Sequence, residues 1–149
     1  MWWKARTRWS DAAFEAEHGR VPGGRIAILG FGRLGSRQLT AESDLDLVVV
    51  YDFDPEDRSS DGRRPLDAGV YYNRLTQRLV AALTAPTRRG GLYEVDLRLR
   101  PSGSAGPVAT SLPRFIAYLD AVLPRYRQFD DLHALLRNTV VPALQARAA

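Results

Sequence analysis

The sequence predicts an α+β fold, in which short strands and helices share one core and a helical C-terminal tail follows. The compact apolar runs 25–29 and 45–53 are short enough to be buried strands. Segment 92–100 alternates apolar and polar residues with a period of two, as a strand with one polar face does. Segments 67–84 and 124–142 repeat apolar residues at three- and four-residue spacing, which is typical of helices packed on a core.

Capping and turn residues indicate where these elements begin and end. Ser10 is suited to cap a short helix that runs through Ala16 and stops at Gly19. Residues 21–24, Val-Pro-Gly-Gly, form a turn sequence, and Ser111 precedes a further helical segment. Loops are expected at 30–36, 54–65, 85–91 and 101–107, where glycine, proline and charged residues gather.

The composition excludes several classes of protein. The chain of 149 residues suits one core, and it contains no cysteine, which rules out disulfides and thiolate metal sites. No apolar run of about 20 residues occurs, so no membrane span is expected, and the charged start is unlike a signal peptide. The net charge is +4, but 21 basic residues are scattered among 17 acidic ones, which argues against a nucleic-acid groove. A cytoplasmic protein is therefore expected.

Three acidic residues form the candidate site. Asp44 and Asp46 stand two positions apart at the start of the second predicted strand, so their carboxylates project from one face about 7 Å apart. Asp96 lies on the polar face of the later alternating strand, together with Arg98 and Arg100. Three such carboxylates are suited to hold two Mg²⁺ ions about 3.5–4 Å apart, the arrangement used for phosphoryl and nucleotidyl transfer. The two arginines would add positive charge for phosphate oxygens.

The glycine-containing loop before these acids is the candidate phosphate site. Gly35 and Ser36 supply backbone N–H groups and a hydroxyl suited to phosphate oxygens. Residues 30–35 also fit the dinucleotide-binding fingerprint Gly-x-Gly-x-x-Gly, with acidic residues roughly 20 positions farther on. Only nine residues separate Gly35 from Leu45, whereas a crossover between parallel strands needs about a dozen or more. The spacing therefore favours the nucleotidyl-transfer site.

The motifs at these positions resemble those of one enzyme family. The stretch 24–37, Gly-Arg-Ile-Ala-Ile-Leu-Gly-Phe-Gly-Arg-Leu-Gly-Ser-Arg, and the stretch 43–47, Ser-Asp-Leu-Asp-Leu, are similar to adenylyltransferase domains of the bifunctional glutamine synthetase adenylyltransferase/adenylyl-removing family. The stretch 93–103, Tyr-Glu-Val-Asp-Leu-Arg-Leu-Arg-Pro-Ser-Gly, resembles the same family's third-carboxylate strand and the loop after it. The resemblance implies a DNA polymerase β-like nucleotidyltransferase core, with a small mixed sheet and helices packed against it.

By this resemblance the three acids are the catalytic, metal-binding residues, and the nucleotide-binding loop comprises Gly35, Ser36 and Arg37. Arg98 and Arg100 would complete the nucleotide-binding set. The implied reaction moves AMP from MgATP to a tyrosine of glutamine synthetase and so regulates nitrogen assimilation. A PII-type signalling protein would act through regions absent from this chain. The glycine-loop and 100–103 motifs are closer to the family's AMP-adding domain than to its AMP-removing domain.

The resemblance divides the chain into a helical lead-in at 1–20, a catalytic core at 21–120 and an unrecognised helical tail at 121–149. Gln38 stands where the family usually has Glu, and the residues after Tyr118 do not resemble its following helical segment. Because the family enzyme is several times longer, this chain is expected to be a fragment. Another polymerase β-like nucleotidyltransferase with a different acceptor and a catalytically silent nucleotide-binding fragment are the alternative functions.

Overall fold

The computed structural model describes residues 11–32, 38, 40, 44–88, 90–91, 93–125 and 130–146. The chain divides into two compact units, Met1–Thr110 and Ser111–Ala149. The division therefore falls ten residues before the end of the expected core at residue 120. Within the described ranges, no helix is long and apolar enough to cross a bilayer.

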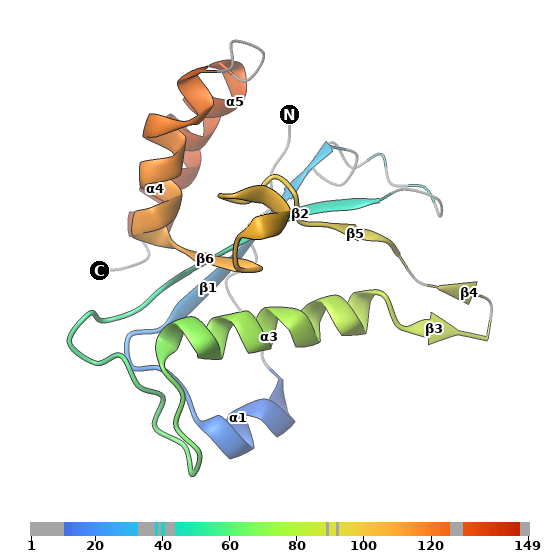
Figure 1. Ribbon diagram of the computed structural model, residues 1–149, viewed down its shortest axis with the longest axis vertical. Helices are drawn as coiled ribbons and strands as arrows, with labels where there is room; N and C mark the ends of the chain where they lie inside the picture. The colour runs from blue at the N-terminus through green and yellow to red at the C-terminus, as the bar shows by residue number, and fades with distance from the viewer. Residues whose placement is uncertain are drawn as a thin grey trace. The chain divides into compact units, whose positions relative to one another are not determined.

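The first unit is built on a mixed sheet, which has four strands in the described part of the chain. Strands β1 (Arg25–Phe31) and β2 (Leu45–Asp52) are antiparallel neighbours, and β5 (Val95–Asp96) lies parallel to β2 on its other side (Figure 1). Strand β6 (Ala109–Ser111) also pairs with β2. This arrangement of strands and helices confirms the α+β class.

The pairing of β1 with β2 excludes the dinucleotide-binding alternative. In that fold, the strand before the glycine fingerprint and the strand after it run parallel. Here residues 25–31 pair antiparallel with residues 46–52, and Gly30 stands opposite Leu47. The glycines after β1 therefore do not open a parallel crossover unit, in agreement with the short spacing before Leu45.

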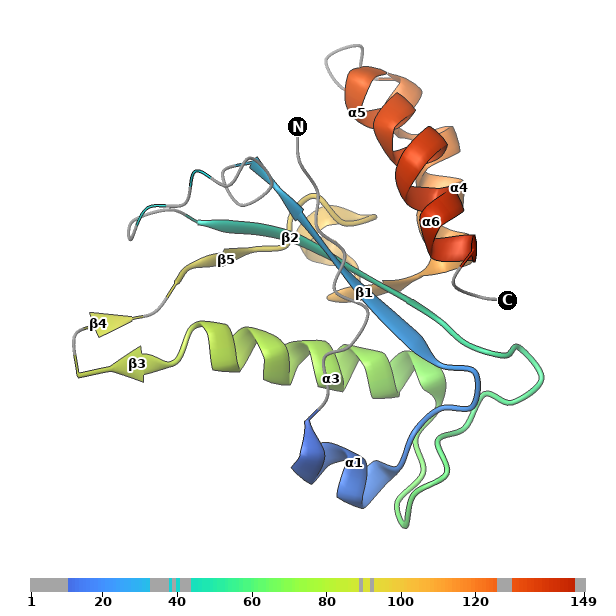
Figure 2. The ribbon, with the colours of Figure 1, turned by 180° about the vertical axis from the view of Figure 1, so that it is seen from behind.

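Helix α3 (Ala68–Leu83) connects β2 to β5 and lies along one face of the sheet (Figures 1 and 2). Asp67 caps the helix by accepting the N–H of Gly69 at 2.9 Å. The helix buries aromatic residues, and Tyr72 stacks on Tyr51 of β2 with ring centroids 4.6 Å apart. This burial fixes β2, and with it the acids at its start, against the helix. The core on this face comprises Phe14, Val21, Ile26, Val49, Tyr51, Ala68, Tyr71, Tyr72, Leu75 and Ala109.

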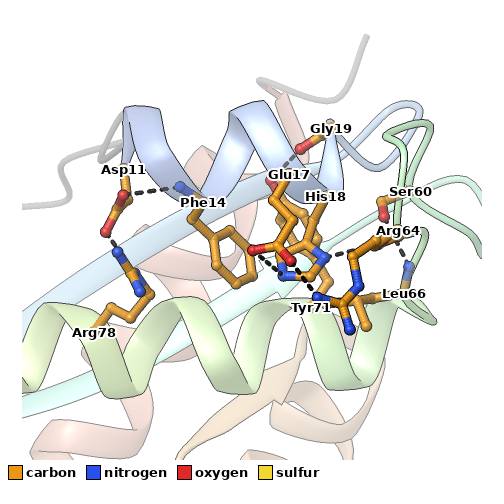
Figure 3. A network of polar contacts seen from close by, with 10 residues as sticks. All are labelled: Asp11, Phe14, Glu17, His18, Gly19, Ser60, Arg64, Leu66, Tyr71 and Arg78. Carbon is orange, nitrogen blue, oxygen red and sulfur yellow. Dashed lines mark hydrogen bonds and ion pairs between the residues drawn. The ribbon is translucent and has the colours of Figure 1, made fainter.

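Helix α1 (Ala12–His18) packs on α3 and belongs to the first unit (Figure 3). Its cap comes one residue later than predicted, because Asp11 accepts the N–H of Phe14 at 3.0 Å. The same carboxylate accepts Nε of Arg78 on α3 at 2.6 Å. Phe14 meets Tyr71 edge-on, with ring centroids 5.0 Å apart. The short helix is thus held by tertiary contacts, among them this ion pair and this aromatic contact, rather than by its own length.

The loop between β2 and α3 also contacts helix α1. Arg64 pairs with Glu17 at 2.7 Å, and its carbonyl oxygen lies 2.7 Å from Nδ1 of the buried His18 (Figure 3). Gly62 approaches α1 so closely that a Cβ there would lie 2.1 Å from the carbonyl carbon of His18. Helix α1, the loop and α3 therefore form one packed layer against the sheet.

A short hairpin stands within the loop expected at 85–91. Strand β3 (Pro86–Thr87) pairs antiparallel with β4 (Gly90–Gly91), and both strands are exposed. The hydroxyl of Thr87 donates to the carbonyl of Gly90 at 2.6 Å. Figures 1 and 2 show the hairpin extending beyond the end of α3, on the path that leads into β5.

The strand predicted at 92–100 is wrong in length, since among the described residues 93–100 only the two residues of β5 are paired in the sheet. The backbone turns after Asp96, because the Asp96 carboxylate accepts the main-chain N–H of Arg98 at 2.8 Å. The N–H of Arg100 then bonds to the carbonyl of Leu97 at 3.2 Å, which closes a turn instead of extending the sheet. The alternating pattern therefore does not place Asp96 and the two arginines on one strand face.

The second unit is helical. Helix α4 (Leu112–Ala121) begins directly after Ser111, as predicted. A π-helical segment, Leu136–Val140, leads into a helix that continues past Pro142. The apolar spacing expected up to Pro142 therefore lies on helical backbone, and this proline is the second residue of the helix that follows the π segment. The remaining elements are η2 (Leu123–Arg125), α5 (Asp130–Leu135) and α6 (Val141–Ala146).

Candidate active site

Two acidic residues stand side by side where β2 pairs with β5. Asp46 and Asp96 are register partners in this parallel pair, so their side chains leave the same face of strands that lie about 4.8 Å apart. The pairing is supported by the N–H of Leu45, which donates to the carbonyl of Glu94 at 2.8 Å. Leu45 and Leu47 are buried, so the opposite face of β2 is anchored in the core.

The end of β1 makes room for one of these carboxylates. Phe31 stands opposite Asp46 in the antiparallel pair, and Gly32 follows with φ at +57°, a conformation that favours glycine. A Cβ on Gly32 would lie 2.6 Å from Oδ2 of Asp46. Sequence reasoning assigned this glycine to a turn and missed the contact. The available signal was a glycine directly after one strand, shortly before an Asp-x-Asp pair that opens the next.

The charges of the three predicted acids act on one another. The pKa of Asp46 is raised, chiefly because the side chain is partly buried and further because Asp96 and Asp44 are negative. Arg98 opposes this shift. Asp44 is exposed and directly precedes β2. The start of β2 is therefore a place of concentrated negative charge, which favours a cation.

Asp96 already has a cationic partner. Nε of Arg98 donates to both carboxylate oxygens of Asp96, at 3.0 and 2.8 Å, and Nη2 donates to Oδ2 as well. This pairing, together with the main-chain N–H of Arg98, lowers the pKa of Asp96. The sequence predicted that Arg98 would add positive charge for phosphate oxygens. In the structure, its guanidinium is paired with the Asp96 carboxylate instead.

The Arg100 side chain has a structural role in the loop that follows Asp96. Its side chain is buried and donates to three main-chain carbonyls: those of Leu97 at 2.7 Å, Pro107 at 3.0 Å and Gly106 at 3.3 Å. These bonds close the loop that follows Asp96. The expectation that Arg100 shares the face of Asp96 is wrong, because the strand ends before it and the chain has turned.

Replacing Arg100 by Gln is expected to lower the free energy of unfolding by about 2 kcal/mol, since carbonyls inside the loop lose charge-assisted donors. Urea denaturation of the two proteins measures the difference. The matched control is Arg88→Gln, an exposed arginine of the β3–β4 hairpin, for which a change within about 0.5 kcal/mol is expected. Equal effects of the two substitutions would contradict the bracing role of Arg100.

The acids offer oxygen ligands of the type that Mg²⁺ prefers. Asp46 and Asp96 are adjacent, and Asp44 stands at the entrance of the strand. Among the residues that the structure describes, however, no three acidic or histidine side chains are gathered as a metal site. The predicted phosphate-binding residues 35–37 lie outside the described residues.

A separate groove of about 490 Å³ lies between α1 and α3. None of its lining residues belongs to β2 or β5, so it is distinct from the acidic pair. Two of its charged side chains are engaged in ion pairs, Glu17 with Arg64 and Arg78 with Asp11. The first pair joins α1 to the loop before α3, and the second joins the cap of α1 to α3.

The fold and the site together define a small α+β unit with two carboxylates paired across parallel strands beside a glycine. A family model described as glutamate-ammonia ligase adenylyltransferase matches residues 1–123, and the chain belongs to this family. The relatives that it matches carry the name bifunctional glutamine synthetase adenylyltransferase/adenylyl-removing enzyme.

The chain covers only a small part of these relatives. It is 58% identical over 111 residues to the protein of Rhizobium meliloti strain 1021, which is 72% of this chain and 11% of that protein. With the protein of Agrobacterium fabrum strain C58, it shares 58% identity over 104 residues, which is 70% of this chain and 10% of that protein. The chain thus spans about a tenth of the length of these curated relatives.

One relative also matches part of the helical tail. The protein of Bradyrhizobium sp. strain BTAi1 is 46% identical over 137 residues, which cover 90% of this chain and 14% of that protein. Such a match leaves about 15 of the 149 residues uncovered, so it includes part of the segment 121–149. The sequence motifs alone had left this segment unrecognised.

Proposed function

We propose that this chain carries a nucleotidyltransferase active site that moves AMP from ATP to a tyrosine of glutamine synthetase. The observation that carries the proposal is the pairing of Asp46 with Asp96 across β2 and β5, with Gly32 against the Asp46 carboxylate. The name of the relatives supports the choice of AMP as the transferred group and of glutamine synthetase as the acceptor.

We infer that the α+β core is of the DNA polymerase β-like type. Three features favour it: antiparallel β1 and β2, a parallel β5 reached through α3, and acids on the two parallel strands. In this core the end of β1 and the start of β2 lie at the same edge, because the two strands are antiparallel neighbours. The chain leaves β1 after Phe31 at that edge, ahead of the predicted phosphate-binding residues 35–37 in the sequence.

Asp44, Asp46 and Asp96 are the residues that would hold Mg²⁺. The fit rests on the register pairing of Asp46 with Asp96. The pKa of Asp46 is raised by partial burial and by the negative charges of Asp96 and Asp44, and a bound cation would oppose this shift. When bound, the metal supplies positive charge that neutralises the triphosphate. Gly35, Ser36, Arg37 and Arg98 would contact phosphate oxygens, whereas the buried Arg100 holds the loop that follows Asp96.

The transfer is an in-line displacement, in which the tyrosyl oxygen attacks the α-phosphorus and pyrophosphate leaves. We assign Asp96 as the acceptor of the hydroxyl proton. Its lowered pKa in the pair with Arg98 makes it a weak base, so this pair has to open before the proton moves. Opening is geometrically simple, since the Arg98 side chain is 79% exposed.

Transfer of label from α-³²P-ATP to purified glutamine synthetase, in the presence of Mg²⁺, tests the proposal. Label on the synthetase is expected with the wild-type chain and is expected to be lost with Asp44→Asn. Label that persists in this variant would contradict the assignment of the acids. Incubating adenylylated synthetase with phosphate tests the adenylyl-removing activity that the relatives' name also includes.

A catalytically silent nucleotide-binding fragment is the second candidate. The ion pair between Asp96 and Arg98 favours it, because this pair occupies a carboxylate that transfer requires. In this second case, target docking, and regulation by a PII-type protein in the cytoplasm, would need the rest of the enzyme, of which the chain spans about a tenth. ATP binding without pyrophosphate release would identify this case.

A further inference from the structure

We propose that Arg98 is a built-in counter-cation of the acidic site, which competes with a divalent metal ion for Asp96 and so sets the metal affinity. The inference rests on the proposed function, because it assumes that Asp46 and Asp96 bind the metal. It assigns Arg98 a positioning role that differs from simple phosphate binding. Asp96 would be open to a divalent ion only after Arg98 has left the carboxylate, and the released arginine would then be free to contact the triphosphate.

The geometry of the pair supports this role. Nε of Arg98 contacts both oxygens of Asp96, and the main-chain N–H of the same residue donates to Oδ1 at 2.8 Å. One residue therefore covers both oxygens that a metal would use. Because the strand ends at Asp96, the chain turns and brings a residue only two positions away back onto the carboxylate.

The negative charges around Arg98 also support its role as a counter-cation. Asp46 and Asp44 raise the pKa of Arg98 in addition to the larger effect of Asp96. The guanidinium thus lies in the electrostatic field of all three acids, as a bound cation would. Arg98 also lowers the pKa of Asp46, against the effects of Asp96 and Asp44, so its charge acts on both paired acids.

The exposure of the Arg98 and Asp96 side chains allows a divalent ion to replace the arginine. The side chain of Asp96 is 18% exposed, whereas that of Arg98 is 79% exposed. Arg98 can therefore move into solvent without breaking core packing, while Asp96 stays in the sheet. An exposed ion pair is also weak enough for a divalent ion to displace it.

The test is a titration of the 149-residue chain with Mn²⁺ in the absence of nucleotide, followed by the electron paramagnetic resonance signal of free Mn²⁺. Arg98→Gln is expected to bind Mn²⁺ about threefold to tenfold more tightly than wild type, because an exposed bidentate pair no longer competes. Arg98→Lys, which keeps the charge but loses the two-oxygen contact, is expected to fall between them.

The control variants distinguish a failure of the proposed role of Arg98 from a failure of the proposed metal site. Arg74→Gln removes the same charge from an exposed position on α3 and is expected to leave Mn²⁺ affinity unchanged. Asp46→Asn is expected to weaken binding in every background. If wild type binds Mn²⁺ and Arg98→Gln binds it equally or less tightly, Arg98 is no competitor and only this inference falls. If neither protein binds Mn²⁺, the proposed metal site falls together with it.

Discussion

Replacing Asp46 by Asn is expected to lower adenylyl transfer by at least about 10²-fold, because the site loses one of its two adjacent carboxylates. Asparagine has almost the same shape, so the space beside Gly32 stays filled and the fold is kept. The initial rate of label transfer from α-³²P-ATP to glutamine synthetase measures the effect. Turnover retained at the wild-type rate would remove Asp46 from the mechanism.

The stability of this variant provides an independent check. The pKa of Asp46 is raised in the folded protein, so its ionisation destabilises the native state at neutral pH. Without metal, Asp46→Asn is therefore expected to melt at the same temperature as wild type or higher at pH 7. The difference should shrink as the pH falls through the raised pKa toward the ordinary value of 3.8, where wild type is protonated as well.

Asp52→Asn is the matched control for activity. Asp52 lies at the other end of β2 and pairs with Arg25 at 3.2 Å. The substitution removes the same charge from the same strand, six positions along β2 from Asp46. Transfer at close to the wild-type rate is expected. A loss as large as that in Asp46→Asn would show that charge on β2, rather than the paired acids, controls the reaction.

Replacing Gly32 by Ala is expected to lower transfer by about 10²-fold, through displacement of Asp46. The new Cβ would lie 2.6 Å from Oδ2 of Asp46, so the carboxylate has to move away from its place beside Asp96. The φ of +57° adds backbone strain of about 1–2 kcal/mol to the free energy of folding. Label transfer and urea denaturation measure the two effects separately.

Gly103→Ala separates strain from collision. Gly103 has φ at +51°, but a Cβ there would lie 3.7 Å from the carbonyl oxygen of Arg98, which is an ordinary contact. A similar loss of stability with a much smaller loss of activity is expected. Equal losses of activity in the two alanine variants would mean that backbone strain, and not the position of the Asp46 carboxylate, explains the effect of Gly32→Ala.

Local patterns predicted most of the elements of the first unit. The helix expected at 67–84 is α3 with its two caps, because the apolar spacing and Asp67 agree. The strand expected at 45–53 is β2, whose β-branched residues are buried at its centre. The strand expected at 92–100 was too long, because alternation does not reveal that Asp96 bonds to the main chain of Arg98 and turns it.

The sequence by itself determined the α+β class, the order of strands and helices, and the motifs that place the chain in its family. These properties depend on local periodicity, caps and residue types, all of which are present in the linear sequence. Only the tertiary structure decided that Asp96 stands beside Asp46, that Gly32 leaves room for the carboxylate, and that the two arginines differ. Such relations arise between segments far apart in the chain, where side chains compete for the same partners, and no local pattern records which contact wins.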